Sequence, residues 1–193
     1  MHRARQPADS DPPDAFVTDE ALMLALRGGS REAFEVLFDR HRDAVWRFFK
    51  RRVDDCERVE ELVQDVFVAI LQNAVRYEPR SLFRSYLFGI AFNALKADRR
   101  RAKSRRTEPL VDEPEAARPD PDIAIWIRGA LSSLDADHRE VLMLREYEQL
   151  SYQEIADLLR IPVNTVRSRL FRARVDLKDA LSNVPVSGGE GLT

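Results

Sequence analysis

Residues 151–174, SYQEIADLLRIPVNTVRSRLFRAR, constrain the fold of this chain more than any other segment. Ser151 and Glu154 have the spacing of a capping box, in which each side chain binds the other's backbone amide at a helix start. Arg160-Ile161-Pro162 interrupts the helical pattern, because proline is tolerated only near the beginning of the next helix. The segment therefore predicts two short helices joined by a tight turn.

The second helix of this pair separates apolar from polar residues. Val163, Val166 and Leu170 fall on one side at helical spacing, and residues 163–175 contain four arginines and no acid. Arginine can donate two hydrogen bonds to a phosphate or to a guanine edge, so this face predicts a helix that enters a groove of duplex DNA. A solvated basic helix is the alternative, but solvated faces usually mix signs. The polar side carries Asn164, Thr165, Arg167, Ser168, Arg169 and Arg172.

Charge is segregated along the chain, so its net charge of −2 says little about any one surface. Residues 96–106 hold seven basic residues and one acid, whereas residues 108–122 hold six acids, one basic residue and four prolines. Acids that repel each other and prolines that exclude a helix predict a flexible linker over residues 107–121.

The predicted fold is all-α, with two small helical domains on either side of this linker. The domains cover residues 18–106 and 122–182, and the tails 1–17 and 183–193 are predicted to be disordered. No apolar run approaches the roughly 20 residues that span a bilayer, and the N-terminus lacks the apolar core of a secretory signal. The single cysteine, Cys56, excludes an internal disulfide and fits a cytoplasmic protein.

Capping signals divide the first domain into helices. Thr18 is expected to cap a helix that ends at Gly28-Gly29, and Ser30 is expected to cap a longer apolar-striped helix on which His41 is a core residue. A third helix covers residues 56–71, with Leu71 on its apolar side. A loop follows over residues 73–80, and Ser81 is expected to cap a helix that begins aromatic and ends basic, with Phe83, Tyr86 and Ile90 in the core.

Three segments resemble the extracytoplasmic-function (group IV) class of bacterial RNA polymerase sigma factors, in the sigma-70 family. AFEVLFDRHRDAVWRFF resembles the first conserved helix of that family, and ELVQDVFVAIL resembles its polymerase-binding helix. LDADHREVLMLREYEQLSYQEIADLLRIPVNTVRSRLFRAR resembles its promoter-reading domain. The resemblance covers about residues 19–182.

The resemblance implies a protein that binds core RNA polymerase, through the largest-subunit coiled coil and the β flap, and directs it to −35 and −10 promoter elements. It places polymerase contacts on the acidic and amide face of the third helix, at Glu61, Gln64 and Asp65. It places a flipped base of the opened −10 strand in the loop over residues 73–80, and the strand backbone on the basic helix. The implied −10 residues are Asn73, Arg76, Tyr77, Asn93, Lys96, Arg99 and Arg100.

The same resemblance places −35 recognition on the helix-turn-helix, through the polar residues given above together with Arg160. Arg160 and Asn164 stand where the family often has glycine, and Phe92 stands where many members have arginine. The acidic linker is expected to thread the RNA channel of the polymerase. An anti-sigma factor is a further partner that the family commonly uses.

Two other classes of protein compete with this interpretation. A stand-alone helix-turn-helix regulator would use only the C-terminal domain and would bind a palindromic site without polymerase. A helical enzyme is the second alternative, but three histidines, one cysteine and no glycine-rich phosphate loop give no catalytic constellation. No catalytic residue, metal or cofactor is therefore expected.

Overall fold

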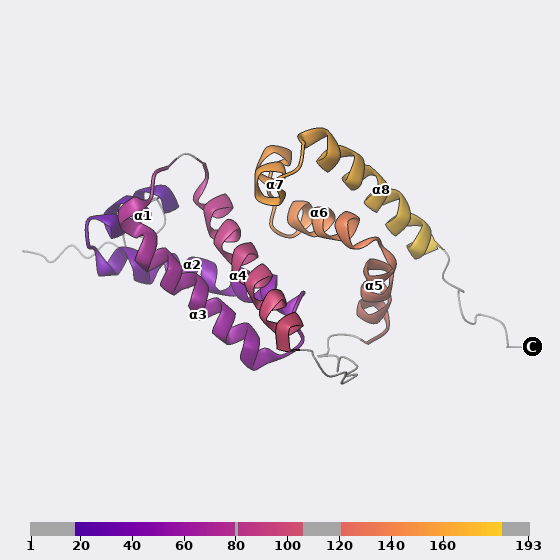
Figure 1. Cartoon of the computed structure of the whole chain (residues 1–193), viewed down its shortest axis with the longest axis horizontal. Coiled ribbons are helices and arrows are strands. Elements are labelled where there is room, and N and C mark those ends of the chain that lie inside the picture. The colour runs from indigo at the N-terminus through magenta and orange to yellow at the C-terminus, as the bar shows by residue number, and fades with distance from the viewer. Residues whose placement is uncertain (1–17, 80, 106–120, 183–193) are drawn as a thin grey trace, which may run out of the picture. The chain divides into compact units, whose positions relative to one another are not determined.

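The computed structural model describes residues 18–79, 81–105 and 121–182, and in these residues all regular secondary structure is helical (Figure 1). The predicted all-α fold is confirmed. The predicted tails and the predicted linker up to residue 120 lie outside the described residues. The elements are α1 Asp19–Arg27, α2 Arg31–Lys50, α3 Cys56–Asn73, the 3-10 helix η2 Ala74–Arg76, α4 Phe83–Arg105, α5 Pro121–Ser133, α6 Ala136–Glu146, α7 Tyr152–Leu159 and α8 Val163–Ser182.

The chain forms two compact units. The first holds α1, α2, α3, η2 and α4 up to Arg99, and the second holds α5 to α8. In Figure 1 these helices run from indigo to magenta in the first unit and from orange to yellow in the second. Two helical bodies in one chain agree with the predicted two-domain architecture.

The core of the first unit is apolar and aromatic. Phe48 and Phe49 of α2, Ile70 of α3 and Phe88 of α4 are fully buried, and each large side chain removed from water contributes about 1.5–3 kcal/mol. His41 lies in this core and its Nε2 is 2.7 Å from a carboxylate oxygen of Asp19. The prediction that His41 is a satisfied structural residue is confirmed.

Two predicted caps of the first unit are confirmed. The hydroxyl of Thr18 accepts a hydrogen bond from the Ala21 amide at 3.2 Å, and that of Ser30 accepts one from the Ala33 amide at 3.1 Å. Gly29, which ends the turn between α1 and α2, has φ +97°, a left-handed backbone that glycine adopts without a steric cost. Thr18 and the glycine turn therefore set the two ends of α1, and Ser30 sets the start of α2.

The predicted loop over residues 73–80 begins too early. Helix α3 continues through Asn73, whose side-chain amide donates to the Ala69 carbonyl at 2.8 Å. A 3-10 turn then follows, closed by a bond from the Tyr77 amide to the Ala74 carbonyl. The helix extends because Ala74 is buried, a tertiary contact that periodicity up to residue 71 does not reveal. Leu71, predicted on the apolar side, is 44% exposed.

The predicted cap at Ser81 is also corrected. Helix α4 begins at Phe83, and the Leu82 carbonyl accepts from the Ser85 and Tyr86 amides. The amide of Phe83 donates to the carboxylate of Glu20 in α1 at 2.7 Å. A side chain 63 positions away therefore supplies the contact that local sequence assigned to a serine.

In the second unit the capping box predicted at the start of α7 is confirmed. The Glu154 amide donates to the Ser151 hydroxyl at 3.2 Å, and the Ser151 amide donates to the Glu154 carboxylate at 2.7 Å. Pro121, which the prediction placed in the linker, is the first residue of α5. Proline fits there because the first amides of a helix have no intrahelical partner.

Candidate polymerase and nucleic-acid interfaces

Helix α8 presents one polar face to solvent because its other face is fixed in the core of the second unit. Val166, Leu170 and Ala173 are buried in a unit where α8 packs against α5, α6 and α7. Asn164, Arg167, Ser168 and Arg172 are exposed, and Thr165 is half-buried. The Arg167 guanidinium donates to the Asn164 side chain at 3.2 Å, so these two side chains are oriented together.

Arg169 does not share the exposure of its neighbours on α8. Its side chain is 26% exposed, and its guanidinium lies 2.5 Å from a carboxylate oxygen of Asp137 in α6. Arg174 is paired with Glu146 of α6 at 2.8 Å, and this hydrogen bond raises the pKa of Arg174. Helical spacing predicts Arg169 among the outward arginines, because spacing does not reveal an acid 32 positions upstream.

The turn before α8 places a further arginine at its surface. Arg160 is exposed and has φ 57° and ψ 47°, the left-handed conformation that often ends a helix. Its backbone amide donates to the Ala156 carbonyl, which closes the last turn of α7. A non-glycine residue in this conformation costs about 1–2 kcal/mol.

Helix α3 carries the acidic face that the sequence predicts. Glu61, Gln64 and Asp65 are all exposed, on the side opposite the buried Val63 and Phe67. Glu61 is ion-paired with Arg58. Arg58 also contacts Asp98 of α4 at 2.6 Å, and these two carboxylates raise its pKa.

An exposed apolar stripe continues this face toward the end of α3. Val68, Leu71 and Val75 follow one another at helical spacing and are 48%, 44% and 76% exposed. Exposed apolar side chains that adjoin a polar rim are typical of interaction surfaces. The sequence does not reveal this stripe, because apolar periodicity by itself does not distinguish buried from exposed apolar residues.

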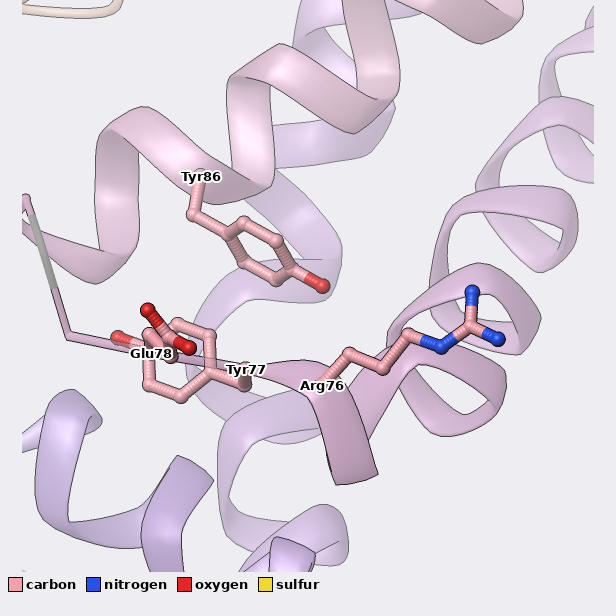
Figure 2. Close-up of a pocket in the computed structure, with 4 residues that line it drawn as sticks. All are labelled: Arg76, Tyr77, Glu78 and Tyr86. Atoms are coloured by element: carbon pink, nitrogen blue, oxygen red, sulfur yellow. The ribbon is translucent and has the colours of Figure 1, made fainter.

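A shallow hollow of about 310 Å³ lies where the loop after η2 meets α4, lined by Arg76, Tyr77, Glu78 and Tyr86 (Figure 2). Tyr77 is buried, and its ring packs edge-on against that of Tyr86 at 5.1 Å between centroids. Burial raises the pKa of both tyrosines. Arg76 is exposed and extends away from the two rings.

Tyr86 and Glu78 are residues of this hollow that sequence analysis did not assign to a site. Tyr86, predicted as core, is only half-buried, whereas Phe83 is buried as predicted. Asn73 is exposed on the last turn of α3 and is not among the residues that line the hollow. Aromatic rings beside charged side chains are the surface on which unstacked bases bind.

The predicted basic face of α4 is exposed. Asn93, Lys96, Arg99 and Arg100 lie within two helical turns and are open to solvent. The ammonium of Lys96 lies 4.6 Å from the ring centroid of Phe92, which is itself buried. The aromatic residue at position 92 therefore packs in the core and orients a neighbouring cation.

Within residues 18–79, 81–105 and 121–182, no group of three or more His, Cys, Asp and Glu side chains could hold a metal ion. In the same part of the chain, no helix combines the length and apolar character needed to cross a bilayer.

Both units match known protein families. The sigma-70 region 2 model matches residues 37–106, and the sigma-70 region 4 model matches residues 124–177. The RNA polymerase sigma factor CarQ of Myxococcus xanthus is 32% identical over 168 residues, covering 84% of this chain and 97% of CarQ. The ECF RNA polymerase sigma-E factor of Escherichia coli K12 is 30% identical over 175 residues, covering 82% of this chain and 91% of that factor.

Solved structures give the same fold. CnrH in complex with the cytosolic domain of CnrY is 25% identical, with a TM-score of 0.65 over 86% of this chain and 99% of that chain. The sigma factor RpoE of Bartonella quintana, in complex with the anti-sigma factor NepR, is 24% identical with a TM-score of 0.67, covering 79% of this chain and 98% of that chain.

A unit that matches region 2 and a helix-turn-helix unit that matches region 4, in one chain, define a two-part transcription initiation factor. The chain belongs to the extracytoplasmic-function sigma factors of the sigma-70 family. It binds core RNA polymerase and directs it to promoter DNA, as the sequence predicted. The stand-alone regulator is not favoured, because the matches extend over both units.

Proposed function

We propose that the protein divides this work among three surfaces on two domains, residues 18–106 and 122–182. The outer face of α3 binds the polymerase, the α3–α4 loop and the basic face of α4 bind the opened −10 strand, and α8 reads the −35 element. The observation that carries the proposal is the exposed face of Arg167, Ser168 and Arg172, which no acid interrupts on the first three turns of α8.

On the polymerase side, Glu61, Gln64 and Asp65 suit a basic partner helix of the largest-subunit coiled coil. Carboxylates form short, charge-assisted bonds with arginine, which gives both attraction and a preferred register. The exposed apolar stripe of Val68 and Leu71 extends this surface by one to two turns. A mixed acidic and apolar helix face is what a helical partner needs to bind in one orientation.

For the −10 element, the hollow between the loop and α4 supports binding of an unstacked base. Tyr86 offers a partly exposed ring, and Arg76 is an exposed lining residue whose cation can bind the strand backbone. Asn93, Lys96, Arg99 and Arg100 then follow the strand backbone, where lysine and arginine neutralise phosphates. Tyr77 acts from beneath as a buried support for Tyr86, and Asn73 lies at the edge of the surface.

For the −35 element, we assign base and phosphate contacts to Arg167 and Arg172 and phosphate anchoring to Ser168 and Thr165. Asn164 and Arg160 lie at the turn, where they can contact the flanking backbone. Arg169 is paired with Asp137, so we assign it a smaller contribution than Arg167 and Arg172. The β flap of the polymerase is expected to bind this domain.

The remaining assignments follow from this role. The protein is not itself a catalyst and uses no cofactor, since the polymerase performs the chemistry, and it works in the cytoplasm, where the polymerase is. The acidic segment between the domains is expected to occupy the RNA channel. The solved relatives CnrH and RpoE are bound to CnrY and to NepR, which supports an anti-sigma factor as a partner of this chain as well.

The decisive experiment is runoff transcription with purified core polymerase on a genomic promoter pool, with and without this protein. We expect new, discrete start sites preceded by a shared −35 and −10 sequence. The Arg172→Ala variant should lose these starts, while Arg31→Ala, which changes an exposed arginine on α2, should keep them. Absence of association with core polymerase at near-physiological salt would overturn the proposal.

A further inference from the structure

Helix α1 contacts both ends of the loop between η2 and α4, which we propose reads the −10 strand. This helix lies upstream of the residues that match region 2. Glu20 contacts the amide of Phe83, where the loop enters α4, and Arg27 reaches the carbonyl of Tyr77, where the loop leaves η2. These two contacts come from one short helix. They enclose the segment that carries Glu78 and leads to Tyr86.

The contact made by Glu20 is the stronger of the two. Its carboxylate accepts from the Phe83 amide at 2.7 Å, in a half-buried position at the start of a helix of 23 residues. A carboxylate at a helix N-terminus satisfies a free amide and also interacts favourably with the helix dipole. It therefore determines the residue at which α4 begins.

The second contact, made by Arg27, is longer and lies at the other end of the loop. The Arg27 guanidinium lies 3.5 Å from the Tyr77 carbonyl. Tyr77 is 3% exposed, and its buried hydroxyl makes no hydrogen bond to the described residues. Besides burial, the charges of Glu20, Tyr86 and Asp19 raise the pKa of Tyr77.

Helix α1 is itself held in place, so it can act as a fixed support. Met23 is fully buried, and Leu22 and Leu26 pack beside it. Asp19 binds His41 at 2.7 Å and Arg40 at 3.1 Å, both on α2. Helix α1 therefore links the position of the loop to the core of the unit.

We propose that α1 is a positioning element for base selection in the −10 element, with Glu20 as its main positioning residue and Arg27 as an auxiliary one. The inference rests on the proposed function, since it requires the loop to read the −10 strand. Without Glu20 the loop would sample several positions around Tyr86, and discrimination between bases would fall more than total transcription.

The test compares base preferences of the holoenzyme on two promoter libraries, one randomised in the −10 element and one in the −35 element. Wild type, Glu20→Ala, Glu20→Gln and Arg27→Ala are assayed, with Glu35→Ala on the exposed face of α2 as the matched control. Glu20→Gln retains an acceptor without the charge and carries the test if the alanine variant loses helical structure. Arg76→Ala and Tyr86→Ala form a separate arm that changes the loop itself.

We expect Glu20→Ala to reduce the −10 preference about fivefold to tenfold, as the loss of one charge-assisted hydrogen bond implies, and to leave the −35 preference unchanged. Arg27→Ala should have a smaller effect in the same direction. Faster amide exchange in the peptide that contains Phe83, measured on the free protein, should accompany the loss.

A uniform fall in transcription on both libraries, with the −10 preference intact, would overturn the inference and make Glu20 a purely stabilising residue. If the Arg76 and Tyr86 variants also leave the −10 preference unchanged, the loop does not read this element, and the proposed −10 site fails with the inference. A changed preference in those two variants but not in Glu20→Ala removes only the role of α1.

Discussion

Arg169 of α8, the helix that also carries the exposed Arg167 and Arg172, forms an ion pair with Asp137 of α6 at 2.5 Å. The arginine is 26% exposed and the aspartate 64% exposed, so solvent reaches the pair and its net contribution to stability is small. Its main effect is on the charge of the DNA-reading face. Two of the four arginines of the reading helix, Arg169 and Arg174, are therefore balanced by acids of α6.

Removal of that acid should strengthen non-specific DNA binding. In Asp137→Asn we expect the salt dependence of holoenzyme binding to non-promoter DNA to steepen by about one phosphate contact, because Arg169 is released toward the backbone. The measurement is a titration of binding against salt concentration. Glu35→Gln is the control, and an unchanged slope would show that Arg169 does not approach DNA.

Arg172 is expected to contribute more to promoter selection than Arg169. Arg172 is exposed, so Arg172→Ala should lower transcription from a cognate promoter about tenfold or more, the effect of about 1–3 kcal/mol for one base contact. Binding to core polymerase should be unchanged in a pull-down. Arg169→Ala should weaken transcription less, and an equal loss from both variants would contradict this ranking.

Reversal of charge on the outer face of α3 should weaken binding to core polymerase, which the α8 variants leave unchanged. Asp65→Arg is expected to weaken core polymerase binding on the order of tenfold or more, because it places a cation on the face that we propose docks on a basic partner helix. Asp39→Arg, at an exposed acid on α2 of the same unit, is the matched control. Unchanged affinity of Asp65→Arg in a competition assay for core polymerase would remove Asp65 from the docking face.

Arg160→Gly should stabilise the second unit. The left-handed backbone at this position, φ 57°, costs a non-glycine residue about 1–2 kcal/mol that glycine does not incur. Glycine also loses more chain entropy on folding, so we expect a net gain of about 0.5–1 kcal/mol. Thermal unfolding followed by circular dichroism measures it. A lower Tm would mean that the arginine side chain makes a compensating contact.

Acid should weaken the start of α6. The Asp135 side chain accepts from the amides of His138 and Asp137, and these bonds lower its pKa below the ordinary value of 3.8. Because the pKa of Asp135 is lower in the folded than in the unfolded state, the stabilisation is complete above the unfolded-state pKa. It is lost as pH falls through the folded-state pKa. Asp135→Asn keeps an acceptor without titrating, so its Tm should fall less than that of wild type between pH 5 and about pH 3. Parallel Tm curves for the two proteins would contradict this.

Local signals in the sequence were sufficient for the helices of the first unit, for the pair α7 and α8, for the caps at Thr18, Ser30 and Ser151 and for the exposed face of α3, but they did not delimit α5 and α6. The capping box of Ser151 and Glu154 and the cap at Thr18 act between residues three positions apart, so their chemistry can be read directly from spacing. The acid-free run on α8 likewise predicted an exposed basic face. The errors lie where a distant side chain intervenes.

The sequence by itself determined that this protein is helical, that it separates an acid-faced helix from an arginine-rich one, and that it resembles a sigma factor, since periodicity and charge patterning act over a few residues. Only the tertiary structure decided that Glu20 rather than Ser81 caps α4, that Tyr86 borders a hollow, and that Asp137 holds Arg169. These features join residues from different helices. Packing of the cores brings such residues together, and spacing along the chain does not encode which of them meet.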